Sequence, residues 1–208
     1  MAEITYNPHV SVSSPFGVAD LPTLFVWRNR LHRWNGEPEE ELGAFMDEHL
    51  ARENVETWAA YRDGELGGYL EASPGELSFA TDGSVAAVAR VEMIFKREFF
   101  KRRPEEENGA SAGGQHVTQP ALNLVLRELF DGEFELVFFP LAASNRPIQS
   151  LVQSVGAAKV GSVGENVSLY LLSREEWKLA NAAFVAEYER VNPPPPVEVV
   201  EPMMEYAE

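Results

Sequence analysis

The sequence predicts an α+β (α/β) protein, in which helices flank a mixed central β-sheet. The chain has 208 residues, 45% of them hydrophobic, so it can bury a core of ordinary size. An Asp-Gly pair between two strand-like runs indicates a hairpin. In the second half of the chain, strand-like and helix-like segments alternate, and this alternation favours parallel pairing through helical crossovers.

The first part of the chain is expected to form one extended segment and two helices. Residues 4–14 contain alternating apolar and polar positions and predict a strand or an extended arm. Asp20 and Thr23 are candidate N-caps for a helix that ends at the Asn-Gly turn of residues 35–36. Pro38 starts a second helix, whose acidic first turn suits the positive end of the helix dipole.

The middle of the chain is predicted to be mainly strand. Two strands surround the Asp-Gly turn at residues 63–64, and residues 73–75, Ser-Pro-Gly, predict a further turn. Residues 84–99 are rich in β-branched and aromatic side chains and predict a central strand. Residues 101–114 are polar, glycine-rich and interrupted by proline, so they predict a loop.

The second half alternates between helices and strands. An apolar stripe predicts a helix over residues 118–130, and a buried strand is expected over 134–142. A helix should begin near Pro147 and stop at Gly156, a residue suited to the left-handed position after a helix. Residues 159–172 then predict a hairpin around a Gly-Glu-Asn turn.

The last helix and the tail define the domain boundary. Ser173 and Glu176 have the spacing of a capping box at the start of a helix over residues 174–191. Four consecutive prolines then end the helix. We therefore expect a single domain over residues 1–191 and an acidic, proline-rich tail over 192–208, which is either flexible or an arm that docks onto a partner.

Composition excludes several classes of function. The chain has no cysteine, so disulfides, thiolate zinc sites and cysteine nucleophiles are excluded. Its net charge of −16 repels phosphate backbones, and no nucleic-acid partner is expected. No run of about 18 apolar residues is present, and the first residues lack the features of a signal peptide, so no membrane partner and a cytoplasmic location are expected.

Residues 134–156 carry the most specific signal, namely a buried strand, a polar turn with Asn145, and a helix that stops at Gly156. This segment resembles the GNAT acyltransferases, whose pattern is Asn-x-x-Ala-x-x-Leu-Tyr-x-x-x-Gly-Phe. Asn145, Leu151 and Gly156 fall in register with that pattern, and the resemblance extends over residues 58–172. It implies a GNAT-like fold that uses acetyl-CoA, in a divergent member of bacterial or bacteriophage type.

The resemblance also implies a binding site for coenzyme A. In the family, a glycine-rich loop and a helix start bind the pyrophosphate, because both present unpaired amides. The residues to which cofactor binding transfers are Phe95, Lys96, Arg97, Gly113, Gly114, Gln115, His116, Val117, Thr118 and Asn145, of which Asn145 would contact the pantetheine region. A strand amide at a bulge near residues 95–97 would hold the oxyanion. Alternatively, the basic residues form a solvated surface, the glycines a plain connection, and Asn145 only a helix cap.

The resemblance implies two catalytic residues. Glu92 on the central strand would accept the amine proton, directly or through a water molecule, although it could instead face outward and pair with Arg90. Many family members have a tyrosine as general acid where this chain has Val152, and valine cannot donate a proton. Tyr170 and His116 are the nearest candidates for that role.

Two functions therefore remain open. The first is an acetyl-CoA-dependent N-acyltransferase that acts on an amine of a small molecule or protein. The second is a GNAT-like protein that has lost catalysis, is of possible phage origin, and binds or supports a partner through its C-terminal tail. Assembly into a homo-oligomer is open in both cases, and the sequence does not identify the acceptor.

Overall fold

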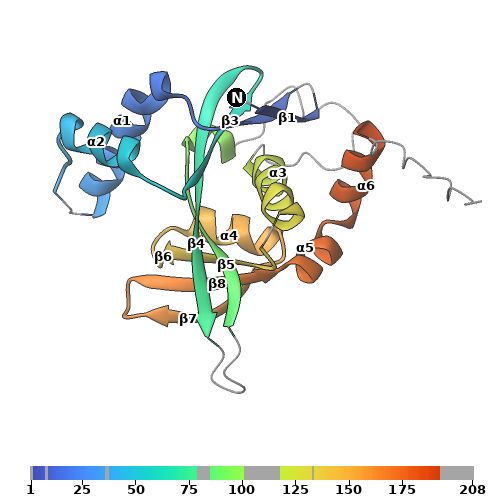
Figure 1. The fold of residues 1–208 in the computed structure, drawn as a ribbon. Coiled ribbons are helices and arrows are strands. Elements are labelled where there is room, and N and C mark those ends of the chain that lie inside the picture. The colour runs from blue at the N-terminus through green and yellow to red at the C-terminus, as the bar shows by residue number, and fades with distance from the viewer. Residues whose placement is uncertain are drawn as a thin grey trace, which may run out of the picture.

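The computed structural model describes residues 2–7, 9–35, 38–78, 85–100, 118–132 and 134–192. Within them, one mixed sheet of eight strands has the order β1-β2-β3-β4-β5-β6-β8-β7, and only β5 and β6 pair in parallel. The strands are β1 (Ala2–Asn7), β2 (Val10–Ser14), β3 (Glu56–Arg62), β4 (Glu65–Ser78), β5 (Val85–Phe95), β6 (Leu136–Ala142), β7 (Ala158–Val163) and β8 (Val167–Ser173). The long β4–β5 pair runs across the direction of β7 and β8, so the sheet is strongly twisted (Figure 1).

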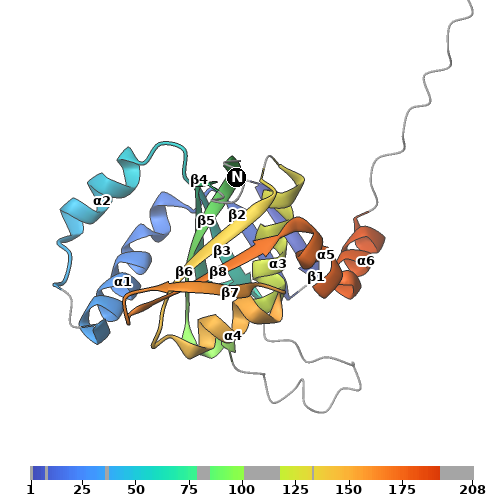
Figure 2. The ribbon, with the colours of Figure 1, turned by 90° about the horizontal axis from the view of Figure 1, so that it is seen from below.

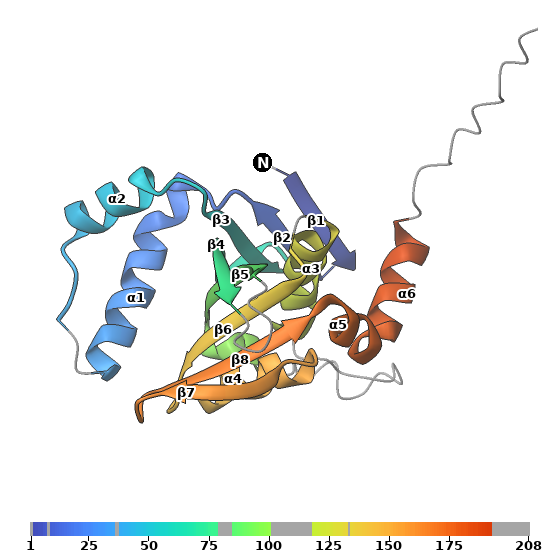
Figure 3. The same ribbon diagram turned by 60° about the horizontal axis from the view of Figure 1, so that its bottom comes forward.

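The helices cover the sheet from two sides. They are α1 (Leu21–Asn35), α2 (Leu42–Ala51), α3 (Thr118–Asp131), α4 (Arg146–Ser154), α5 (Arg174–Ala180) and α6 (Ala182–Val191), with short 3-10 turns η1 (Val18–Asp20) and η2 (Arg97–Phe100). Helices α1 and α2 lie together on one side, and α5 and α6 lie on the other (Figures 2 and 3). None of these helices is both long and apolar enough to cross a membrane.

Two cores result from the alternation of side chains along the strands. Ala59 and Tyr69 point to one face and pack with Leu24 of α1 and Phe45 of α2. The next residue on each strand points to the opposite face, where Leu70 and its neighbours join the larger core that α3, α4, α5 and α6 cover. The sheet is therefore buried on both faces, which explains its many apolar positions.

The predicted hairpins are confirmed. Asp63 and Gly64 connect β3 to β4 with positive φ angles of 51° and 77°, as a two-residue turn that matches the strand twist requires. Strands β7 and β8 form the late hairpin. Residues 4–14, expected to form one strand or arm, instead lie within the β1–β2 hairpin.

The turn predicted at residues 73–75 is wrong, because β4 continues through it and pairs with β5 as far as Ser78. The β4–β5 register opposes Pro74 to Ala89, and the amide of the flanking residue Lys96 donates to Gly67. Backbone groups alternate in direction along a strand, so Gly67 and every second residue after it face β5, whereas the nitrogen of Pro74 faces the other way. On that side the pairing with β3 reaches only to Ala72. The missing N–H of proline therefore costs the sheet no hydrogen bond.

The central strand predicted over residues 84–99 is shorter than expected. Strand β5 ends at Phe95, and the next residues fold into η2. This turn brings the Phe99 ring onto Gly67 of β4, where a Cβ atom would lie only 1.7 Å from the ring. The glycine thus permits a close contact that the sequence pattern did not indicate.

The predicted helix starts are confirmed except that of the second helix, which begins at Leu42 and not at Pro38. Residues 38–41 are not helical, because the backbone of Glu40 exchanges hydrogen bonds with the Asn29 side chain of α1.

One helix is interrupted. Ser173 and Glu176 form the predicted capping box. The helix predicted over residues 174–191 is divided into α5 and α6 at Asn181, whose buried side chain donates to the carbonyls of Trp177 and Val155. The predicted tail lies outside the described residues from position 193 onward.

Candidate active site

Strands β5 and β6 separate along their length. They pair only over Val88–Arg90 and Leu136–Phe138. Strand β5 continues to Phe95 and β6 to Ala142, without further pairing between them. Because the two strands are parallel, their carboxyl-terminal halves open a gap in the middle of the sheet.

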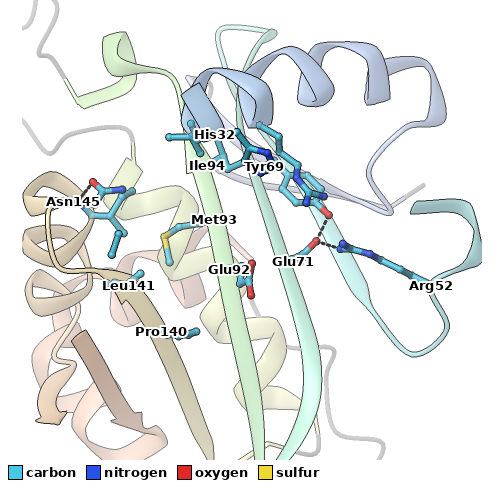
Figure 4. A pocket seen from close by; sticks show the side chains of 14 residues that line it. His32, Arg52, Tyr69, Glu71, Glu92, Met93, Ile94, Pro140, Leu141 and Asn145 are labelled. Atoms are coloured by element: carbon cyan, nitrogen blue, oxygen red, sulfur yellow. Dashed lines mark hydrogen bonds and ion pairs between the residues drawn. The ribbon is translucent and has the colours of Figure 1, made fainter. Parts of the chain in front are cut away.

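A cavity of about 260 Å³ lies at this gap, on the side that α1 covers. Figure 4 shows residues of β4, β5 and β6 around it. Its wall is formed by Arg28, Leu31 and His32 of α1, Arg52 directly after α2, Tyr69 and Glu71 of β4, Glu92, Met93 and Ile94 of β5, Pro140, Leu141 and Ala142 of β6, and Asn145 and Ile148 at the start of α4.

The gap exposes backbone amides of β5. The Lys96 amide donates to the Gly67 carbonyl at 2.8 Å, so alternate amides of β5 point toward β4. The amides of Met93 and Phe95 consequently point the other way, toward the side from which β6 has separated. The predicted bulge near residues 95–97 is wrong, since the β4–β5 register is continuous up to Phe95. These amides are available because the neighbouring strand diverges.

Glu71 is held firmly in the cavity wall. Its Oε2 atom accepts hydrogen bonds from Arg52 at 2.7 Å and from the Tyr69 hydroxyl at 2.5 Å. Arg52 also binds Glu48, its neighbour along the chain, at 2.5 Å. Burial, together with the adjacent Glu71 carboxylate, raises the pKa of Tyr69 above its ordinary value of 10.0. The hydroxyl therefore remains a hydrogen-bond donor at neutral pH.

His49 of α2 lies behind this group. Its Nε2 atom is 3.5 Å from the Tyr69 hydroxyl. Burial lowers the pKa of His49 below its ordinary value of 6.5, and the cations Arg52 and Arg28 act in the same direction. The imidazole is consequently neutral at pH 7 and does not add positive charge to the wall.

Glu92 lies in the cavity wall, as a residue with the predicted catalytic role must. Its position on β5 is directly opposite Glu71 on β4, and Figure 4 shows the two carboxylates beside each other. Its side chain is 48% exposed and contacts Arg90 at 2.5 Å. Pairing with Arg90 and a place in the cavity wall are thus compatible.

Two predicted cofactor-binding residues lie at helix starts. Asn145 lines the cavity and also caps α4, accepting a hydrogen bond from the Ile148 amide at 3.4 Å. Thr118 is the first residue of α3 and is 1% exposed. Within the described part of the chain its hydroxyl oxygen has no hydrogen-bond partner. A buried hydroxyl without a partner at a helix start is suited to an anionic ligand.

Tyr170 lies behind the cavity and not in its wall. The ring is buried, and the hydroxyl donates to Gln149 Oε1 at 3.3 Å. Gln149 in turn donates to the carbonyls of Ala142 and Ala143 at 2.8 and 2.9 Å. This group ties the end of β6 to α4, so Tyr170 supports the turn that presents Asn145. The catalytic role of Tyr170 stays a prediction.

The predicted residues Phe95, Lys96 and Arg97 do not line the cavity. Lys96 binds Glu65 at 3.0 Å and lies over the Trp27 ring, and Phe95 packs beside Gly68. Arg97 is exposed on the surface. The predicted residues Gly113, Gly114, Gln115, His116 and Val117 lie outside the described residues.

Sequence reasoning missed five polar residues of the cavity wall, namely Arg28, His32, Arg52, Tyr69 and Glu71, and also Gln149 behind it. The period-two alternation of Tyr69 and Glu71 along β4 puts both on one face, and this signal was present in the sequence. Nothing in the sequence pattern indicated that Arg52, 19 residues earlier, would reach Glu71.

Neither a family model nor a curated protein sequence matches the chain. Solved structures do match. An uncharacterised protein of Bacillus halodurans superposes with a TM-score of 0.59 at 11% identity, over 86% of this chain and 92% of its own. A domain from Methanocaldococcus jannaschii superposes with a TM-score of 0.58 at 16% identity, over 79% of this chain and 97% of its own. Aminoglycoside acetyltransferase AAC(6')-Ib, solved with coenzyme A, superposes with a TM-score of 0.56 at 19% identity, over 81% of this chain and 98% of its own. The chain therefore has the GNAT-like fold that its sequence predicted.

Proposed function

We propose that this chain is an acetyl-CoA-dependent N-acyltransferase that acts on an amine of a small molecule or protein. The observation that carries the proposal is the cavity at the gap between β5 and β6, beside the outward amides of β5. The similar fold of AAC(6')-Ib, which was solved with coenzyme A and kanamycin, supports it. Such a gap admits an extended ligand between two strands, where the sheet itself supplies hydrogen-bonding groups.

The residues present fit this cofactor. Thr118 offers a hydroxyl that has no partner among the described residues, at the start of α3, where amides and the helix dipole favour a phosphate. The amides of Met93 and Phe95 can donate to oxygens of the cofactor arm or to the acyl oxygen. Asn145 faces the gap from its other side. Bound acetyl-CoA would supply a thioester, whose carbonyl carbon forms a C–N bond with the amine as its C–S bond breaks.

Glu92 is the residue to which we assign the proton of the attacking amine. It lies in the cavity wall and is half exposed, so a substrate or a bridging water can reach it. We assign no side chain as general acid. Val152 is fully buried and apolar, and the Tyr170 hydroxyl is bound to Gln149, so water in the open cavity protonates the departing sulfur.

Calorimetry and thermal melts with acetyl-CoA test the cofactor site. At 100 times its dissociation constant, acetyl-CoA should stabilise the fold by about 2.7 kcal/mol. Thr118→Val removes the hydroxyl but keeps the shape. Affinity should fall about 10- to 100-fold through loss of a bond to a charged group. Stability without ligand should not fall, since no residue that the structure describes binds this hydroxyl.

Thr5→Val makes the same chemical change on the exposed strand β1 and should leave affinity unchanged. Release of thiol from acetyl-CoA in the presence of amines then tests turnover. A protein that shows no stabilisation at millimolar acetyl-CoA would contradict the proposal. That outcome would favour a binding protein that acts through residues 193–208.

A further inference from the structure

The arginines of the cavity wall are already paired with carboxylates of the protein. Both guanidinium groups already hold carboxylates, Arg28 with Glu40 at 2.7 Å and Arg52 with Glu48 and Glu71. The partners Glu40 and Glu48 do not line the cavity. Carboxylates outside the cavity thus neutralise both arginines, and the arginines do not favour an anionic acceptor.

The carboxylate of Glu71 is arranged differently. Its side chain is only 16% exposed, and both of its donors bind the same oxygen, Oε2. Within the described part of the chain no donor reaches Oε1, so this atom is available to a ligand in the cavity. Because Arg52 and Tyr69 fix the group from α2 and β4, its position is set before any ligand binds (Figure 4).

Glu92 adds a second negative charge at the same place. The two residues form a directly opposed pair across β4 and β5, with Cα atoms about 5.5 Å apart in such a pair. Like charges opposite each other in a sheet are destabilising. A cation bound between them would offset this repulsion, and the cavity provides the room for it.

We propose that Glu71 binds the acceptor's amino group as a cation, so that the acceptors of this enzyme are aliphatic amines. This inference rests on the proposed acyltransferase function and names the substrate class of the same site. An aliphatic amine resembles the lysine side chain, with a pKa near 10.4, and is positively charged at pH 7. An aromatic amine is uncharged there and gains nothing from Glu71. One proton then passes from the ammonium to Glu92, which frees the nitrogen lone pair for attack.

Hexylamine and aniline are the probes for this assignment, with thiol release from acetyl-CoA as the measurement. The wild-type protein should acetylate hexylamine in preference to aniline. Glu71→Gln keeps an oxygen for Arg52 and Tyr69, so the fold is retained, but it removes the charge. Its KM for hexylamine should rise about 10- to 100-fold, as expected for loss of a bond between charged groups, while its affinity for acetyl-CoA changes less than twofold.

Two further variants complete the experiment. Glu71→Asp keeps the charge and should recover part of the affinity for hexylamine. Glu187→Gln removes a charge from the surface of α6, where Glu187 pairs with Arg190, and should leave both KM and acetyl-CoA affinity unchanged.

The outcomes separate this inference from the proposed function. Absence of acetyl-CoA binding in the wild type overturns both. If acetyl-CoA binds, two results overturn only the role of Glu71. Either the wild type acetylates aniline as well as hexylamine, or Glu71→Gln has the same KM as Glu187→Gln. Where turnover of both probes is too slow to measure, calorimetry with hexylamine on the acetyl-CoA complex decides. Heat that Glu71→Gln abolishes supports the inference, and no heat in the wild type overturns it.

Discussion

Replacement of Asn123 should strongly destabilise the fold, although this residue does not line the cavity. Asn123 of α3 is 2% exposed and joins two buried partners. Its Oδ1 accepts from Trp177 Nε1 at 2.9 Å, and its Nδ2 donates to Asn181 Oδ1 at 3.1 Å. These bonds connect α3 to the junction of α5 and α6, so they link the last two helices to the core.

The magnitude follows from the groups that lose a partner. Asn123→Leu keeps a similar volume but leaves the Trp177 N–H and the Asn181 oxygen without one of their bonds. An unsatisfied buried group costs about 1–3 kcal/mol, so the free energy of unfolding should fall by about 2–6 kcal/mol. In a domain of this size, that loss lowers the melting temperature by at least about 4 °C.

Urea unfolding and thermal melts of Asn123→Leu, with Gln119→Leu as control, measure this loss. Gln119 is on the same helix, and its side chain donates to the Ser154 carbonyl at 3.3 Å near the surface. Its replacement should cost about 1 kcal/mol or less. An Asn123→Leu protein that is as stable as the wild type, or more stable, would refute the reasoning, because apolar burial would then outweigh the buried hydrogen bonds.

Three further changes test other parts of the structure. Gly67→Ala places a Cβ atom 1.7 Å from the Phe99 ring and should lower the free energy of unfolding, measured in urea, by about 1–3 kcal/mol. The control Gly43→Ala, with no atom within 4 Å of the new Cβ, should not lower it, and equal effects would contradict the close contact. The wild type should lose stability on acidification below pH 6.5, because the pKa of His49 is lowered in the folded state and the unfolded chain therefore binds more protons there. His49→Gln should lose less, and parallel curves of stability against pH for variant and wild type would refute this. Gln149→Ala removes the donor of two carbonyls at the end of β6 and should lower the free energy of unfolding by about 2 kcal/mol or more, as measured by urea unfolding; a loss under 0.5 kcal/mol would show that water replaces the amide.

Features that depend on neighbouring residues could be predicted from the sequence. The Asp63-Gly64 turn, the Ser173–Glu176 capping box and the cap at Asn145 each involve residues within a few positions of one another. Such signals act through local hydrogen bonds and allowed φ angles, so they are present in the chain before it folds. The alternation of strands and helices gave the element order for the same reason.

Features that depend on distant residues could not be predicted. The sequence pattern of residues 73–75 indicated a turn, but pairing with β5 extends β4 through it. The break at Asn181 depends on a carbonyl 26 residues away in the chain. In both cases the interactions of a segment with the rest of the fold outweigh its local preference.

The candidate site shows the same division. The sequence by itself determined that Glu92 lies on the central strand and Asn145 in the turn before α4, and both line the cavity, while their roles stay predictions. Only the tertiary structure decided that the amides of β5 are exposed by the departure of β6, and that Arg52 and Tyr69 hold Glu71 beside Glu92. The physical reason is that strand separation and the packing of α2 against the sheet are set by many contacts between remote segments, which no local pattern encodes.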